Sequence, residues 1–174
     1  MNYIKYYNSP IGKIFMVSDG KNLINLSFEN SKYYSNTYND CQFKSDLPIF
    51  KSTESWLNIY FKGESPNFTP KIKLIGSDFR IKVWEILLSI PHGQTTTYGE
   101  IARELAISSN LKRMSAQAVG GAIGHNPISI IVPCHRVVGV SGSLTGYAGG
   151  IDKKIALLKL EDAYKDTFIL PKTL

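Results

Sequence analysis

The stretch Ile130-Ile131-Val132-Pro133-Cys134-His135-Arg136-Val137-Val138 places a thiol, an imidazole and a guanidinium between two apolar runs. Such a run predicts a buried strand or core segment. Polar groups are costly to bury unless they are paired, so Cys134, His135 and Arg136 mark a candidate reactive site. The alternative is that Cys134 is a small buried hydrophobic residue, as most lone cysteines are. The adjacent His135 and Arg136, and Pro133 before them, favour the reactive interpretation.

Nucleophilic chemistry at this stretch needs a base and a carboxylate. A cysteine attacks as a thiolate, an imidazole can remove its proton, and a carboxylate behind the imidazole orients it. Cys134, His135 and Glu161 can supply these groups. Adjacent residues of a strand point to opposite faces, so a direct bond between Cys134 and His135 needs a turn at Pro133 and Cys134, or a bridging water. On residue type alone, Glu161 is a solvated helix residue.

The residues before Gly76 predict a sheet and one helix. Strands are expected at 3–7, 13–18 and 23–28, joined by turn signals. The segment 30–46 predicts a loop or irregular strand that contains Cys41. Apolar residues on one helical face predict a helix over 48–61, and 64–76 reads as a linker with one short strand.

The second half is predicted to be helical, so we expect two domains, 1–76 and 77–174. A helix from about Asp78 ends before Pro91, and Thr97 with Glu100 forms a capping box for a helix that ends near residue 106. Ser115 can cap a further helix over 116–123. Two short helices joined by a brief turn are typical of a helix-turn-helix, and also of unrelated helical hairpins. A Gly/Ser-rich loop over 139–150 precedes a last helix over 152–163.

The helix over 116–123 is unusually rich in small residues, and internal glycines weaken a helix by about 1 kcal/mol each relative to alanine. Something must therefore approach its backbone closely. Tight packing in the core and contact with a nucleic-acid backbone explain this equally well from spacing. The small residues are Ala116, Ala118, Gly120, Gly121 and Gly124.

Composition restricts the partners and the compartment. The net charge of +6 and the pI near 9.2 favour a polyanionic partner. The basic residues are scattered, so any contact with DNA must come from a folded face. Cys41 and Cys134 form no CxxC pattern, which argues against disulfides and a zinc site. The sequence lacks a signal peptide and a long apolar run, so we expect a cytoplasmic protein with a free thiol and no membrane contact.

Asn126-Pro127 and the segment 132–139 closely resemble the active-site signature of the O6-alkylguanine-DNA alkyltransferases, also called methylated-DNA:protein-cysteine methyltransferases. The resemblance covers nearly the whole chain. It implies an α+β fold, with an N-terminal ribonuclease-H-like antiparallel sheet with a helix and a C-terminal winged helix-turn-helix domain. Further matching segments lie at 9–12, 56–57, 60–63, 83–84, 90–91, 98–102 and 118–120.

The resemblance implies direct-reversal DNA repair by a suicide methyltransferase. Such a protein binds double-stranded DNA through the minor groove, flips the damaged guanine out of the stack, and moves the O6-alkyl group to its own cysteine in one turnover. O4-alkylthymine is a second candidate substrate. We expect no cofactor, no metal and a monomer. The rival functions are a non-catalytic lesion-binding protein, in which the cysteine is replaced, and a Cys-His hydrolase, whose residue order this sequence does not fit.

The resemblance also assigns roles to single residues. Cys134 matches the nucleophile, His135 the base that acts through a water, and Glu161 the carboxylate behind it. Tyr98 matches the tyrosine that protonates or holds the leaving guanine, and Asn126 the asparagine that ties the helix-turn-helix to the active-site segment. Arg136 remains a buried structural ion-pair partner.

Two further sets complete the site. The base pocket is assigned to a loop in which the backbone N–H of Ala148 can donate to guanine O6; its members are Val137, Tyr147, Ala148 and Gly149. Many family members have an arginine where this sequence has Gln117, which predicts a lower affinity for DNA and a weaker salt dependence. The residues assigned to DNA are Thr97, Ala116, Gln117, Ala118 and Gly120.

Overall fold

The computed structural model describes residues 1–32 and 39–172, which divide into two compact units. Unit 1 comprises Met1–Ile75 and Pro127–Ile131, and unit 2 comprises Gly76–Asn126 and Val132–Leu174. The division after Ile75 lies one residue from the boundary expected from the sequence. The second crossing, at residues 127–131, was not expected. Within the described residues, no helix is both long enough and apolar enough to span a membrane.

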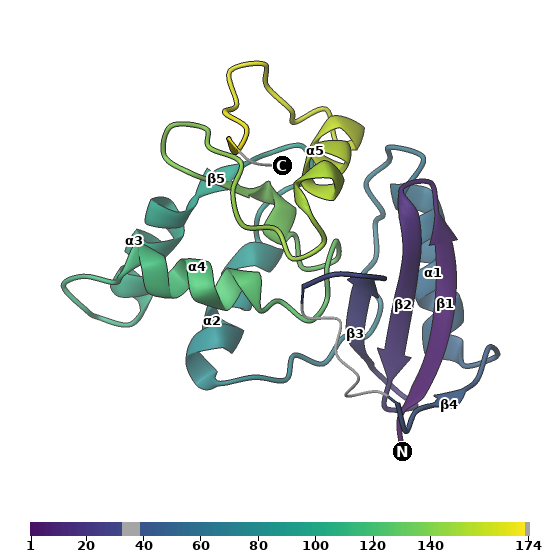
Figure 1. Cartoon of the computed structure of the whole chain (residues 1–174). Helices are drawn as coiled ribbons and strands as arrows, with labels where there is room; N and C mark the ends of the chain where they lie inside the picture. Colours follow the sequence, from purple (N-terminus) through teal and green to yellow (C-terminus); the bar gives the residue numbers. More distant parts are fainter. Residues whose placement is uncertain (33–38, 173–174) are drawn as a thin grey trace. The chain divides into compact units, whose positions relative to one another are not determined.

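Unit 1 is built on a four-stranded sheet with the order β3-β2-β1-β4 (Figure 1). The strands β1 (Tyr3–Ser9), β2 (Gly12–Ser18) and β3 (Leu23–Phe28) pair antiparallel. The short β4 (Gln42–Phe43) pairs with β1 in parallel. The three predicted strands are antiparallel as expected, and β4, which was not predicted as a defined strand, makes the sheet mixed at its edge because two residues are too few to show a pattern. Part of the expected loop, 33–38, lies outside the described residues.

The helix α1 (Pro48–Tyr60) packs on β2 and β3. Pro48 begins the helix, where its missing N–H costs nothing, and Gly63 follows it with φ of 84°, a conformation that glycine adopts without strain. The helix lies along the sheet (Figure 1). Its buried face carries the residues predicted from spacing, together with Phe50: Ile49, Phe50, Thr53, Trp56, Leu57 and Tyr60.

The segment Pro127–Ile131 adds to the β3 edge of the same sheet. The N–H of Leu26 donates to the carbonyl of Pro127 at 2.9 Å, and the N–H of Ser129 donates to the carbonyl of Leu26 at 2.8 Å. Ile130 then takes φ of 71°, which is unusual for a β-branched residue. The opening stretch is therefore buried, as predicted, but it turns where the sequence predicted a strand or core segment.

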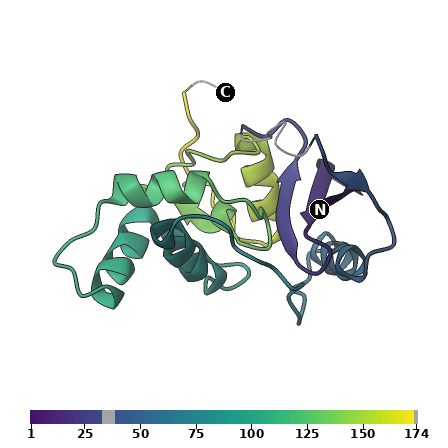
Figure 2. The ribbon, with the colours of Figure 1, turned by 90° about the horizontal axis from the view of Figure 1, so that it is seen from below.

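Unit 2 contains three helices that pack on one another (Figure 2). Ser77 caps α2 (Asp78–Leu88), and Thr97 with Glu100 forms the predicted capping box of α3 (Tyr98–Ser108). Ser115 caps α4 (Ala116–Gly124) through the N–H of Ala118. The predicted starts of these helices follow from their caps, because a side-chain oxygen at the cap satisfies a free N–H of the first turn.

The remaining elements of unit 2 surround the opening stretch. The strand β5 (Thr96–Thr97) pairs in parallel with β6 (Val137–Val138), directly after a 3₁₀ turn, η2 (Cys134–Arg136). The last helix, α5 (Ile151–Leu160), is shorter than the predicted 152–163. A C-terminal segment pairs with the Gly/Ser-rich loop, since Leu144 N–H donates to Ile169 O and Ile169 N–H donates to Gly142 O, both at 2.9 Å.

Candidate active site

The reactive trio lies on a tight turn. The N–H of Cys134 donates to the carbonyl of Val132 at 2.8 Å, and the N–H of Arg136 donates to the carbonyl of Pro133 at 3.0 Å. Such a turn has about three residues per turn, so neighbouring side chains diverge by less than they would on a strand. A turn at Pro133 and Cys134, one of the two expected ways for Cys134 and His135 to interact, is therefore present. All three side chains are buried.

Glu161 is 4% exposed, so its interpretation as a solvated helix residue was wrong. It follows α5, and its carboxylate accepts four hydrogen bonds from three residues, two of them on η2. Oε1 lies 2.6 Å from Nε2 of His135 and 3.0 Å from Nη2 of Arg136. Oε2 accepts from Nε of Arg136 at 2.8 Å and from the N–H of Gly93 at 3.2 Å. Burial alone would raise the pKa of Glu161, but the hydrogen bonds and charges of His135 and Arg136 hold it well below its usual value.

His135 is completely buried. Burial lowers the pKa of the imidazole, and the charge of Arg136 lowers it further, while Glu161 opposes both effects. A carboxylate only accepts hydrogen bonds, so neutral His135 carries its proton on Nε2. The other nitrogen, Nδ1, then keeps the lone pair with which a general base accepts a proton.

The surroundings of the Cys134 thiol have opposing effects on the formation of the thiolate. Burial raises the pKa of Cys134, and several groups oppose this effect. They are a hydrogen bond from Asn126, the charge of Lys154, and the N–H groups of Cys134 and His135. The amide of Asn126 also donates to the carbonyl of Val132 at 2.8 Å. Asn126 thus contacts the sulfur in addition to tying α4 to the active-site segment.

Lys154 is a residue that the sequence interpretation missed. Its side chain is completely buried, and its ammonium donates to the carbonyls of Val137 at 2.6 Å and Thr145 at 3.1 Å. Burial lowers the pKa of Lys154 to about 8. The spacing of Lys154, Leu157, Leu158 and Glu161 is i, i+3, i+4, i+7, which places them on one helical face. That spacing was the available signal, because two leucines on a face indicate that its charged members are buried too.

Tyr98 is the first residue of α3, and its side chain binds the Gly/Ser-rich loop. Its hydroxyl donates to the carbonyl of Thr145 at 3.1 Å, the same carbonyl that Lys154 binds. Burial raises the pKa of Tyr98, and the charge of Cys134 raises it further. The thiol and the phenol are therefore close enough to interact electrostatically. The loop continues to Tyr147, which is buried, and to Ala148 and Gly149, which are partly exposed. Val137, assigned to the same pocket, is fully buried.

The helix α4 has two different faces. Val119, Ala122 and Ile123 are buried, and the indole of Trp84 donates to the carbonyl of Ala122 at 2.8 Å. The opposite face presents Ala116, Gln117, Ala118 and Gly121 to solvent.

The glycines of α4 differ in what surrounds them. A Cβ at Gly120 would lie 3.7 Å from the ring of Tyr98, whereas one at Gly121 or Gly124 would meet nothing within 4 Å. The distance at Gly120 is an ordinary van der Waals contact, so that position has a neighbour within the chain but does not require glycine for packing, whereas Gly121 and Gly124 have no such neighbour. These two leave the backbone open to a partner from outside. Thr97, also assigned to DNA, is partly exposed and its hydroxyl accepts from the N–H of Glu100.

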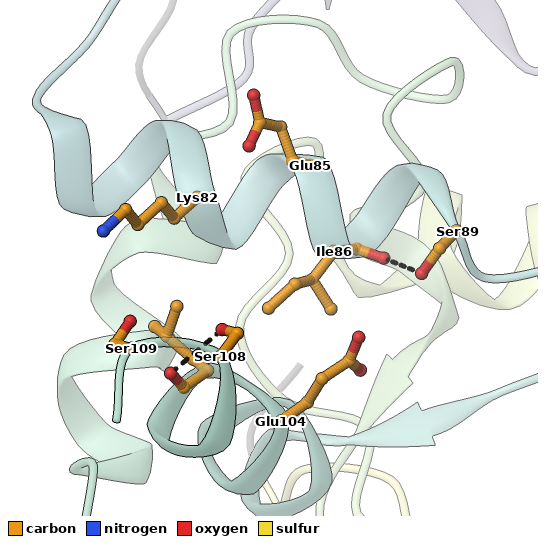
Figure 3. Close-up of a pocket in the computed structure, with 8 residues that line it drawn as sticks. Lys82, Glu85, Ile86, Ser89, Glu104, Ser108 and Ser109 are labelled. Atoms are coloured by element: carbon orange, nitrogen blue, oxygen red, sulfur yellow. Dashed lines mark hydrogen bonds between the residues drawn. The ribbon is translucent and has the colours of Figure 1, made fainter. Parts of the chain in front are cut away.

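A groove between α2 and α3 contains none of these residues (Figure 3). Two of its three serine hydroxyl groups bond to carbonyls of the nearest helix: Ser89 donates to Ile86 O at 2.6 Å and Ser108 donates to Leu105 O at 3.1 Å. The charged side chains of Lys82, Glu85 and Glu104 have mixed signs. The groove therefore lacks convergent polar groups for a ligand.

Two family models match the sequence of this chain. The model of the 6-O-methylguanine DNA methyltransferase ribonuclease-like domain matches residues 2–74, and that of the DNA binding domain matches residues 78–163. A methylated-DNA–protein-cysteine methyltransferase of Mycobacterium tuberculosis is 44% identical over 162 residues, which are 92% of this chain and 93% of that protein. One of Haemophilus influenzae is 39% identical over 160 residues, or 91% and 86% of the two chains.

Solved structures agree as well. A crystal structure of Mycobacterium tuberculosis OGT in complex with DNA aligns with a TM-score of 0.80 at 43% identity, and covers 92% of this chain and 93% of that one. A structure of the Mycobacterium tuberculosis O6-methylguanine methyltransferase aligns with a TM-score of 0.81 at 42% identity over 94% of each chain. The predicted two-part α+β fold is therefore confirmed.

Proposed function

The chain belongs to the family of 6-O-methylguanine DNA methyltransferases, and we propose that Cys134 is the residue that receives the alkyl group. As in its relatives, the activity is direct-reversal DNA repair: the protein binds DNA and transfers an alkyl group to a cysteine of its own. The observation that carries the proposal is the hydrogen-bonded series from Glu161 to His135, next to the thiol of Cys134. Cys41 is instead partly buried against the apolar cluster of Phe15, Val17 and Ile24.

The proposed reaction starts with transfer of the thiol proton of Cys134 to Nδ1 of His135 through one water. The thiolate then attacks the alkyl carbon in line, so that a carbon–sulfur bond forms while the bond from carbon to guanine O6 breaks. The electron pair of the broken bond stays with the guanine, which takes up one proton. The products are a thioether on Cys134 and an unmodified guanine. A thioether is not readily cleaved, so each molecule acts once.

The surroundings of the thiol support this sequence of steps. Asn126 and the backbone N–H groups at Cys134 and His135 stabilise negative charge on the sulfur as it loses its proton. Tyr98 supplies a hydroxyl beside the site, which can turn from the carbonyl of Thr145 toward the leaving guanine. Burial raises the pKa of Tyr98, so the hydroxyl is protonated when the guanine leaves and can donate its proton to it.

We assign the DNA contact to the exposed face of α4. The sequence places Ala116, Gln117 and Ala118 in its first turn, and Gly121 leaves its backbone open. Small residues allow a helix to enter the narrow minor groove. The buried sulfur then requires that the damaged guanine be flipped into the pocket beside Tyr147 and Ala148. A monomer is sufficient for this chemistry, and a free thiol nucleophile fits the reducing cytoplasm.

A mass measurement tests the function. The protein is incubated with a duplex oligonucleotide that carries O6-methylguanine, and intact protein and peptides are analysed. The expected result is a gain of one methylene on the peptide that contains Cys134, with one transfer per molecule. Duplexes with O4-methylthymine and with undamaged bases define the substrate. Tight binding without an adduct would show a lesion-binding protein instead, and repeated turnover would show a hydrolase.

A further inference from the structure

Arg136 uses every nitrogen of its guanidinium within the site. Nε and Nη2 bind the two carboxylate oxygens of Glu161 at 2.8 and 3.0 Å, and Nη1 donates to the carbonyl of Ile90 at 2.6 Å. The residue is 8% exposed, so these bonds are shielded from water. The geometry is the bidentate fork that makes arginine a strong partner of carboxylates. Arg136 is therefore fixed in orientation, and it fixes Glu161 in turn.

Oε1 of Glu161 is shared between His135 and Arg136, which differ in how permanently they are charged. It lies 2.6 Å from His135 Nε2 and 3.0 Å from Arg136 Nη2. A guanidinium is always charged, whereas an imidazole is charged only when protonated. The single negative charge of Glu161 is thus balanced by Arg136 before His135 takes up a proton. Protonation of His135 would add a second positive charge to a carboxylate that is already neutralised.

Burial lowers the pKa of His135 most, and the charged groups around the ring act in both directions. Glu161, at the end of α5, is the group whose charge favours the imidazolium. Arg136 on η2 and Lys154 on α5 both oppose it, and Cys134 next to His135 is neutral until it reacts. Without Arg136, Glu161 would face His135 with an uncompensated charge. A buried carboxylate of that kind raises the pKa of an adjacent imidazole.

We propose that Arg136 is a positioning residue that keeps His135 neutral, and therefore able to accept the proton of Cys134, by neutralising the carboxylate that the two side chains share. This inference rests on the proposed function, because it assigns His135 the role of base. It gives the arginine a part in the chemistry beyond holding the fold. Without this arginine, the charge of Glu161 would act on His135 uncompensated and would raise the pKa of the imidazole against the effect of burial, so that less of the base is neutral.

The test separates charge from hydrogen bonding with two variants. Arg136→Gln keeps a donor toward Glu161 but removes the charge, and Arg136→Lys keeps the charge but loses the fork. The rate of a single methyl transfer is measured against pH. The acid limb of the profile, where His135 becomes protonated, should move to higher pH by about one unit or more in Arg136→Gln. It should return toward the original position in Arg136→Lys.

Arg80→Gln, on α2, is the matched control and should leave the profile in place. A rate that falls equally at all pH values in Arg136→Gln, with the acid limb unmoved, would overturn the inference, because a purely structural arginine gives that result.

A measurement on the unmodified protein covers the case in which Arg136→Gln does not fold. Nitrogen-15 NMR of the imidazole reports the charge and the tautomer of His135 without any DNA. A neutral ring with its proton on Nε2 at pH 7 supports the inference, and an imidazolium at pH 7 overturns it. This readout is independent of transfer: if Cys134 received no methyl group, the proposed function would fail while the charge of His135 could still be measured.

Discussion

Two parts of unit 2 treat polar groups in opposite ways. In the cluster around η2, the side chains of His135, Arg136 and Glu161 are buried and hydrogen-bonded to one another. On the outer face of α4, Gln117 and its small neighbours face solvent, and a Cβ added at Gly121 would meet nothing within 4 Å. Burial is tolerated in the first case because each charge has a partner inside the chain. The contrast teaches that the cluster serves chemistry within the molecule, whereas the α4 face serves a partner outside it.

The largest expected effect comes from breaking the buried cluster. Glu161→Gln removes the charge that pairs with Arg136 and His135, and the loss of one member of a buried pair costs about 3–5 kcal/mol of the free energy of unfolding. Urea unfolding at pH 7 measures it. The pKa of Glu161 is held well below its usual 4.5, so its stabilisation is complete above pH 4.5 and declines as the pH falls below it.

The difference in stability between the Glu161→Gln variant and the original protein should therefore shrink below pH 4.5. Glu104→Gln, on the exposed side of α3, is the control and should change stability by no more than about 0.5 kcal/mol. A difference for Glu161→Gln that does not depend on pH would contradict the account.

The next effect concerns the buried lysine. Burial lowers the pKa of Lys154 from 10.5 to about 8, so between these pH values the unfolded chain binds the proton more tightly than the folded protein does. The free energy of unfolding therefore gains a contribution that grows as the pH rises from 8 to 10.5. Lys154→Met should lack this gain.

Urea unfolding across that range measures the gain of Lys154, with Lys159→Met on the exposed side of α5 as the matched control. Curves of stability against pH that run parallel for the original protein and Lys154→Met would refute the expected titration.

A smaller effect tests the α4 face. Gly121→Ala should raise the free energy of unfolding by up to about 1 kcal/mol, because alanine favours a helix and the added Cβ meets no atom. Gly121→Leu should also fold, yet bind duplex DNA more weakly, since its side chain would stand between the helix and the DNA. Fluorescence anisotropy measures the affinity. Ser55→Leu on the exposed face of α1 is the control, and equal affinities for both leucine variants would remove α4 from the interface.

The smallest effect is electrostatic. Gln117→Arg adds one positive charge to the same face, so the slope of log affinity against log salt should become steeper by about one unit. Binding titrations at several salt concentrations give the slope. Gln42→Arg, on β4, adds the same charge in unit 1. If both substitutions changed the slope equally, the effect would belong to the net charge, and the assignment of Gln117 to the DNA face would lose its support.

Sequence predicted the parts of the fold that local chemistry decides. The starts of α2, α3 and α4 follow from Ser77, Thr97 and Ser115, which act through bonds to their own first turns. The path of residues 127–131 could not be predicted from the sequence, because their hydrogen-bond partner Leu26 lies about a hundred residues earlier in the chain. The parallel pairing of β4 is also a long-range choice that two residues cannot signal.

The candidate site was predictable by residue type but not by environment. Cys134 and His135 were conspicuous because reactive groups interrupted an apolar run. Glu161 and Lys154 looked like ordinary helix residues, and only their shared spacing with Leu157 and Leu158 shows that the charges lie inward. Helical periodicity reports which face a residue occupies, while its partners on η2 come from tertiary structure.

The acceptor residue is the central claim, and the two cysteines allow a direct comparison. Cys41→Ser and Cys134→Ser are each incubated with duplex DNA that contains radiolabelled O6-methylguanine, and protein-bound label and DNA affinity are both measured. The account predicts that Cys41→Ser takes up one methyl group per molecule. Cys134→Ser should take up none and still bind the duplex. Methyl transfer to the Cys134→Ser variant, in which Cys41 is the remaining cysteine, would contradict the account.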